Sequence, residues 1–228
     1  MSRPPSRIAG PGEVQAFLGK HRAIATVARR QPRLLFAVDA TASRQPTWKL
    51  ARQLQADMFR AVGSDTSLAV QLCYYRGFHE LQATGWLQDT GALAAAMARV
   101  HCEGGHTQIA RLLRHARAEH RKTPLRALVF IGDALEESPD DLCQLAGELG
   151  LLKLPLFLFQ EGDDPRVRDT FQSMARLSGG AWARFDQRSA TRLSELLGAV
   201  ARYAAGGRKA LESHTSEGAK LLLQQLPH

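Results

Sequence analysis

Three short apolar segments, each followed closely by acidic residues, constrain the fold of this chain more than any other feature. Residues 33–39 read RLLFAVD and end on an aspartate, and residues 125–132 read LRALVFIG and lead into Asp133. Residues 154–159 read LPLFLF and precede the acidic segment 161–164. Nearly continuous apolar runs of this length are typical of strands buried on both faces in a parallel sheet.

Helical patterns occupy the segments between these strands. Apolar residues recur every three or four positions in residues 46–62, 89–100, 107–121, 164–177 and 189–205, and residues 138–141 open a further helix. Residues 67–75 and 80–87 resemble strands, and the short connection between them indicates a hairpin. We therefore expect an α/β protein with a doubly wound, mostly parallel open sheet, one antiparallel edge strand and a C-terminal tail helix.

The chain is long enough for one domain with a sizeable core, since 44% of its 228 residues are hydrophobic. We expect a disordered N-terminus over residues 1–12 and one domain over residues 13–205, which begins with a helix at residues 13–30. Two adjacent glycines then indicate a linker, so we expect residues 206–228 to form that linker and a tail helix at 208–225.

Composition and charge limit the location of the protein and the class of partner. No apolar run approaches the roughly 18 residues of a membrane span, and the N-terminus lacks the apolar core of a signal peptide. Three widely spaced cysteines do not form a disulfide framework. We therefore expect a cytoplasmic protein, and the arginine-rich, asparagine-free composition indicates a bacterial one. The net charge of +8 suits an acidic partner or a nucleic acid without requiring either.

Asp39, Thr41 and Ser43 stand at alternate positions directly after the first apolar segment, and two interpretations are open. These residue types cap helices, but Pro46 suggests that the next helix begins too far from Asp39 for this aspartate to be its cap. Alternatively, their oxygens turn toward one cation. Carboxyl ends of parallel strands meet at one edge of a sheet, where Asp39 and Asp133 would repel each other unless a hard divalent ion lay between them.

The motif DATAS at residues 39–43 resembles the D-x-S-x-S signature of von Willebrand factor A (vWA) domains, with Thr41 in place of the first serine. The segment GGHTQIARLL resembles the second motif of the family and points to Thr107. The segment VFIGDALEE resembles the third motif and points to Asp133. The order of elements agrees with the family over residues 33–205, so the resemblance covers most of the chain.

The resemblance implies a metal-ion-dependent adhesion site (MIDAS) that holds Mg²⁺ or Mn²⁺. The implied ligands are the hydroxyls of Thr41, Ser43 and Thr107, with Asp39 and Asp133 contacting the ion directly or through water. The resemblance further implies a protein-binding module and not an enzyme. In such modules an Asp or Glu carboxylate of a partner protein completes the coordination of the ion.

Two departures from the family pattern affect the expected site. Thr41 adds a methyl group, and the segment GDALEE lacks the Asp-Gly step that is often found in the family. Glu136 and Glu137 then either lie near the metal or are ordinary exposed acids. Asp163 and Asp164 either add charge at the same edge of the sheet or serve as a turn residue and a helix cap.

Three other functional interpretations compete with the metal site. The helix at residues 107–122 is rich in arginine and would suit a nucleic-acid backbone, although aromatic side chains do not alternate with the basic ones. A strand ending in an aspartate also occurs in metal-dependent phosphohydrolases, but Thr41 stands where those enzymes usually carry a second aspartate. His101, Cys102 and His106 form a small group that lacks the second ligand pair of a zinc finger.

Overall fold

The computed structural model describes residues 31–62, 68–186 and 190–227, and the part from Pro32 onward forms one compact unit. The predicted disordered segment 1–12 and the predicted helix 13–30 lie outside the described residues. The strands are β1 (Arg33–Asp39), β2 (Ala69–Arg76), β3 (Glu80–Ala83), β4 (Ala127–Gly132), β5 (Leu156–Glu161) and β6 (Ala181–Phe185). The helices are α2 (Gln45–Val62), α3 (Thr90–Ala98), α4 (Ile109–Lys122), α5 (Pro139–Leu151), α6 (Pro165–Ser178), α7 (Ala190–Glu212) and α8 (Glu217–Leu223), preceded by the 3-10 turn η1 (Ala42–Arg44).

Within the described residues the strands form one six-stranded sheet in the order β3-β2-β1-β4-β5-β6. The central strand β1 runs parallel to both of its neighbours, β2 and β4. Only the edge strand β3 runs antiparallel, through its pairing with β2. The predicted α/β fold with a mostly parallel sheet and one antiparallel edge strand is therefore confirmed.

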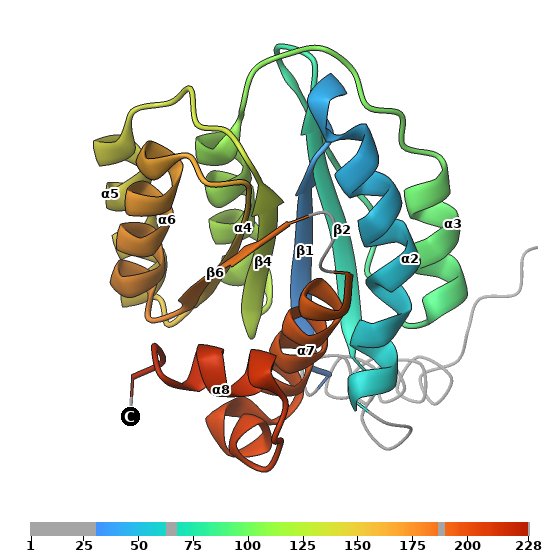
Figure 1. Ribbon diagram of the computed structural model, residues 1–228, viewed down its shortest axis with the longest axis vertical. Helices are drawn as coiled ribbons and strands as arrows, with labels where there is room; N and C mark the ends of the chain where they lie inside the picture. The colour runs from blue at the N-terminus through green and yellow to red at the C-terminus, as the bar shows by residue number, and fades with distance from the viewer. Residues whose placement is uncertain (1–30, 63–67, 187–189, 228) are drawn as a thin grey trace, which may run out of the picture. The chain divides into compact units, whose positions relative to one another are not determined.

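Helices cover both faces of the sheet, because successive side chains of a strand point to opposite faces. Leu34, Phe36 and Val38 of β1 belong to the hydrophobic cluster that contains buried residues of α2, α3, α7 and α8. Leu35 and Ala37 belong to the second cluster, with buried residues of α4, α5 and α6. Figure 1 shows α4, α5 and α6 on one side of the sheet and α2, α3 and α7 on the other. None of the described helices combines the length and the apolar character needed to cross a lipid bilayer.

The loop between α3 and α4 is held against the turn between β2 and β3. A Cβ atom on Gly105 would come within 2.0 Å of the Gly77 carbonyl oxygen, so only glycine permits this close approach. The His106 amide donates a hydrogen bond to the same carbonyl, with an N–O distance of 3.2 Å. This contact brings the segment before α4, which contains Thr107, to the end of the sheet where β1 terminates.

The C-terminal segment differs from the single tail helix that was expected. A kink at Gly207 (φ 71°, ψ −164°), within the predicted linker, divides α7, and helical structure resumes after it up to Glu212. A second helix, α8, then begins because the Ser216 side chain accepts a hydrogen bond from the Ala219 amide. Leu222 is fully buried in the same cluster as α2 and α7. The tail therefore consists of two helical segments that are part of the hydrophobic core.

Candidate metal centre

A depression of about 170 Å³ opens at the end of the sheet where β1 and β4 terminate. It is lined by residues of three loops, which are Thr41, Ala42, Ser43, Gly104, Gly105, Thr107, Ala134 and Glu136. The structure thus brings the three predicted hydroxyl ligands, Thr41, Ser43 and Thr107, to one place. Neither Asp39 nor Asp133 lines the depression itself, although each lies at the strand end from which a lining loop departs.

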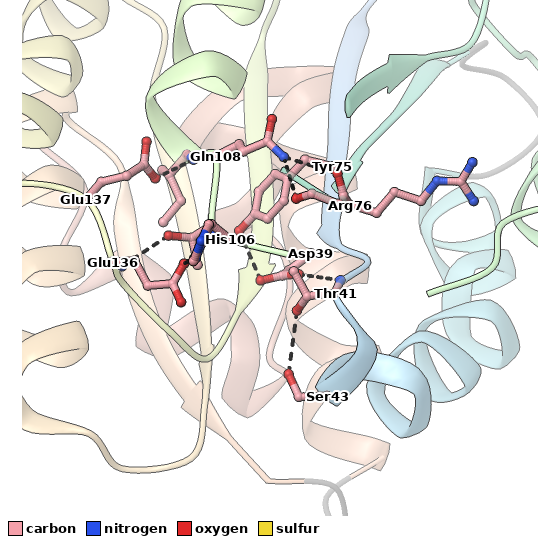
Figure 2. Close-up of polar contacts among 12 residues, drawn as sticks. Asp39, Thr41, Ser43, Tyr75, Arg76, His106, Gln108, Glu136 and Glu137 are labelled. Carbon is pink, nitrogen blue, oxygen red and sulfur yellow. Dashed lines mark hydrogen bonds and ion pairs between the residues drawn. The ribbon is translucent and has the colours of Figure 1, made fainter. Parts of the chain in front are cut away.

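Asp39 is completely buried at the end of β1. Its Oδ1 atom accepts a hydrogen bond from the Thr41 amide at 2.7 Å, and its Oδ2 atom accepts one from the Tyr75 hydroxyl at 3.0 Å (Figure 2). Burial raises the pKa of Asp39, the bonds from Thr41 and Tyr75 oppose this rise, and the nearby charge of Asp133 adds to it. A buried carboxylate with a second carboxylate beside it is an environment that a cation would stabilise.

The local geometry does not support a capping role for Thr41. Thr41 stands at the N-cap position of η1, but its side chain makes no capping hydrogen bond there. The oxygen atoms Oγ1 of Thr41 and Oγ of Ser43 instead lie 3.5 Å apart, and Figure 2 shows them facing each other. Adjacent oxygen ligands of an octahedral Mg²⁺ ion are separated by about 3.0 Å, so this spacing is close to that of a shared ion.

Thr107 is held in position by a reciprocal pair of hydrogen bonds with the loop that follows β4. Its amide donates to Oε2 of Glu136 at 2.8 Å, and its Oγ1 atom accepts from the Glu136 amide at 3.0 Å. The side chain is buried, with 7% of its surface exposed. A hydroxyl oxygen that accepts one hydrogen bond retains a second lone pair, which is available to a cation.

Asp133 is half-buried and follows β4 directly. Burial is the main cause of the raised pKa values of Asp39 and Tyr75, and the charge of Asp133 adds a smaller contribution to both. The two predicted carboxylates are therefore close enough to interact electrostatically. This mutual repulsion is the physical reason to expect a cation between them.

The two glutamates after β4 have different roles. Glu136 lines the depression, whereas Glu137 accepts hydrogen bonds from the amides of Ile109 and Ala110 at 2.6 and 2.8 Å. Glu137 therefore satisfies the first turn of α4, whose own N-cap residue, Gln108, makes no side-chain capping bond. Burial raises the pKa of Glu137, and the two amide bonds oppose this rise.

Sequence analysis did not identify Tyr75 as part of this region, and it left the role of Glu137 open between the metal site and an exposed surface. Tyr75 reaches Asp39 because the register of β1 on β2 places the two residues side by side. A pair of adjacent tyrosines in a strand is the only sequence signal for that contact.

The other acidic and metal-ligand candidates have structural roles. Asp164 caps α6, accepting from the amides of Arg166 and Val167, which confirms the helix-cap interpretation. Asp163 lies 3.8 Å from the Arg184 guanidinium. Within the described ranges, no three His, Cys, Asp or Glu side chains are placed to hold a metal ion together. A zinc site at His101, Cys102 and His106 is thus unsupported, whereas the candidate centre relies mainly on hydroxyls.

Several basic side chains of the arginine-rich helix α4 are engaged within the protein. Arg111 donates a hydrogen bond to the His79 carbonyl, Arg117 pairs with Glu148, and Lys122 lies 2.7 Å from Glu119. The two ion pairs, of Arg117 and Lys122, offset part of the positive charge that α4 would present to a nucleic-acid backbone.

No protein-family model and no curated protein matches this sequence. The structure is similar to the VWA domain of SpRpn10, with a TM-score of 0.57 and 12% identity over 72% of this chain and 95% of that chain. It is similar to an aerotolerance-related membrane protein from Bacteroides fragilis, with a TM-score of 0.57 and 15% identity over 72% of this chain and 96% of that chain.

A third similar structure is proximal thread matrix protein 1 from the mussel byssus, described with a zinc-occupied MIDAS motif. The TM-score is 0.56 and the identity 16%, over 75% of this chain and 46% of that chain. Similarity at such low sequence identity establishes the fold and leaves the function open. The element order, the sheet topology and these solved structures together show that the chain has a vWA-type fold.

Proposed function

We propose that this protein is a vWA-type binding module that uses Mg²⁺ or Mn²⁺ to bind an acidic side chain of a partner protein. The observation that carries the proposal is the convergence of Thr41, Ser43 and Thr107 on one depression at the end of the sheet. Three separate loops supply the lining of this depression, and hard divalent cations prefer such oxygen ligands.

The residues present fit a divalent ion chemically. Thr41, Ser43 and Thr107 would offer hydroxyl oxygens, while Asp39 and Asp133 would supply the negative charge, directly or through water. Burial raises the pKa of Asp39 and the nearby charge of Asp133 adds to this rise, so a cation at the site would stabilise the Asp39 carboxylate and relieve its repulsion with Asp133. When bound, the ion would supply an electrophilic position that accepts a carboxylate from the partner.

We further propose that the protein binds and does not catalyse, and that it acts in the bacterial cytoplasm. Thr41 stands two residues after Asp39, and its amide is bonded to the Asp39 carboxylate. A threonine at this place is a poor general acid at neutral pH, which disfavours the phosphohydrolase alternative. The nucleic-acid alternative is less favoured, because the ion pairs of Arg117 and Lys122 offset part of the positive charge on α4.

The first experiment measures Mg²⁺ and Mn²⁺ binding by titration calorimetry and thermal unfolding. Because the ion binds only the folded state, a concentration ten times Kd should add about 1.4 kcal/mol to the free energy of unfolding. Thr107→Val should abolish this gain. Thr170→Val is the matched control, because Thr170 is also buried but lies in α6. Absence of any response to the ions in the wild-type protein would refute the metal site.

A second experiment distinguishes the classes of partner. Capture of a protein partner should require Mg²⁺, fail in chelator and fail with Thr107→Val. Binding to nucleic acid would instead ignore the chelator and weaken steeply with salt, with a logarithmic slope of about 0.9 per phosphate contacted on duplex DNA. That second pattern, observed with wild-type protein, would overturn the proposed function.

A further inference from the structure

Glu136 is a carboxylate that belongs to the candidate metal centre by position but has no counterpart among the five expected ligands. It lies in the loop after β4 and lines the same depression as Thr41, Ser43 and Thr107. Half of its side-chain surface is exposed to solvent. Glu136 therefore places a further carboxylate at the solvent-facing rim of the depression.

The position of this carboxylate is defined by contacts on two sides. Oε2 of Glu136 accepts a hydrogen bond from the Thr107 amide at 2.8 Å and lies 3.0 Å from Nδ1 of His106. The Glu136 amide in turn donates to Oγ1 of Thr107, so the residue is tied to a proposed ligand through both its backbone and its side chain. Figure 2 shows Glu136 beside His106, with Glu137 directed away toward the start of α4.

We propose that Glu136 sets the charge balance of the metal site, so that it strengthens cation binding and weakens the binding of a partner's carboxylate. This inference rests on the proposed function. Asp39 and Asp133 together would balance the charge of one divalent ion. A third carboxylate on the rim makes the loaded site negative before any partner arrives, and an incoming carboxylate is then repelled by Glu136 while the ion attracts it.

The test replaces Glu136 by glutamine, because the amide oxygen of Glu136→Gln still accepts a hydrogen bond from the Thr107 amide. Removal of one charge near a divalent ion at a solvent-facing site should raise the Kd for Mg²⁺ and Mn²⁺ about tenfold at low salt. The effect should shrink at high salt because of screening. The matched control is Glu217→Gln on α8, whose side chain is 80% exposed and pairs with Lys220, and its Kd should equal that of the wild type.

A second measurement separates the charge effect from a structural one. Acetate serves as the carboxylate probe, and its binding to the Mn²⁺-loaded protein is followed by the relaxation of water bound to Mn²⁺. Glu136→Gln should bind acetate more tightly than the wild type, although it binds the cation more weakly. A variant with a damaged site would lose affinity for both, and that result would overturn the inference.

The remaining outcomes are equally decisive. Equal cation affinity for Glu136→Gln and the wild type would overturn the inference and leave the proposed function intact. No cation binding by the wild-type protein would overturn the proposed function and this inference together. Opposite changes in cation and acetate affinity, with an unaltered thermal midpoint in chelator, are the expected result.

Discussion

The hydroxyl of Tyr75 donates to a carboxylate that the surrounding strands remove completely from solvent. Oδ2 of Asp39 accepts this hydrogen bond, while Oδ1 accepts one from the Thr41 amide. Because Asp39 is fully buried, water cannot replace the Tyr75 hydroxyl as a donor. We predict that Tyr75→Phe lowers the free energy of unfolding by about 1.5–3 kcal/mol, because a buried charged acceptor loses its hydrogen bond. Urea denaturation in chelator near neutral pH measures this loss.

Tyr74→Phe is the matched control for that substitution. Tyr74 is the neighbouring residue of β2, is half-buried, and packs edge-on against Trp48 at 5.8 Å between ring centroids. Removal of its hydroxyl leaves this ring contact in place, so the change should stay within about 0.5 kcal/mol. Equal losses in the two variants would mean that the bond to Asp39 contributes nothing specific to stability.

At the scale of elements, the connection between α4 and β4 contains a pH-sensitive contact. Nδ1 of His120 accepts a hydrogen bond from the Leu125 amide at 3.1 Å, which requires that this nitrogen carry no proton. Burial lowers the pKa of His120 below its ordinary value of 6.5. The unfolded chain therefore binds the proton more tightly than the folded protein does. The contact contributes its whole share of the free energy of unfolding above about pH 6.5, and this share is lost as the pH falls below the lowered pKa.

We predict that His120→Asn weakens this dependence, because the Asn side-chain oxygen accepts the same hydrogen bond and does not titrate. Between about pH 7.5 and about pH 5.5 the variant should lose less stability than the wild type, because His120 takes up a proton in the unfolded wild-type chain more readily than in the folded one. Burial also lowers the pKa of His115, so part of the dependence should remain. His101→Asn, at an exposed position, is the control, and an identical pH profile for His120→Asn and the wild type would refute the prediction.

The elements themselves were largely predictable from the sequence, because apolar runs and helical periodicity are local signals. The strands that end at Asp39 and before Asp133 could be assigned in this way. The position of Thr107 at the same edge of the sheet could be predicted as well. The contact of Tyr75 with Asp39 could not be assigned, because it depends on strand register. The capping of α4 by Glu137 joins residues that are far apart in the sequence, which no local pattern reveals. Metal binding at this edge stays a prediction.

At the scale of the molecule, the C-terminal segment is continuous with the core of the described unit. Ala219 and Leu222 are fully buried in the cluster that contains one face of β1. The side chain of Gln225 accepts a hydrogen bond from the Trp182 amide at 3.0 Å and donates one to the Trp182 carbonyl at 2.9 Å. It thereby satisfies backbone groups of the edge strand β6, which would otherwise be available for pairing with another chain.

We therefore predict that Leu222→Ala destabilises the whole unit and not the tail alone. Truncation of a fully buried leucine should lower the free energy of unfolding by about 2–5 kcal/mol, because it leaves a cavity in the core. Leu151→Ala is the control, since Leu151 is 86% exposed and should contribute almost nothing. If the tail unfolds with the sheet, circular dichroism and tryptophan fluorescence should report one transition in both variants. If Leu222→Ala instead showed two separate transitions, with the fluorescence of Trp182 changing before the circular dichroism, the tail would unfold independently of the sheet.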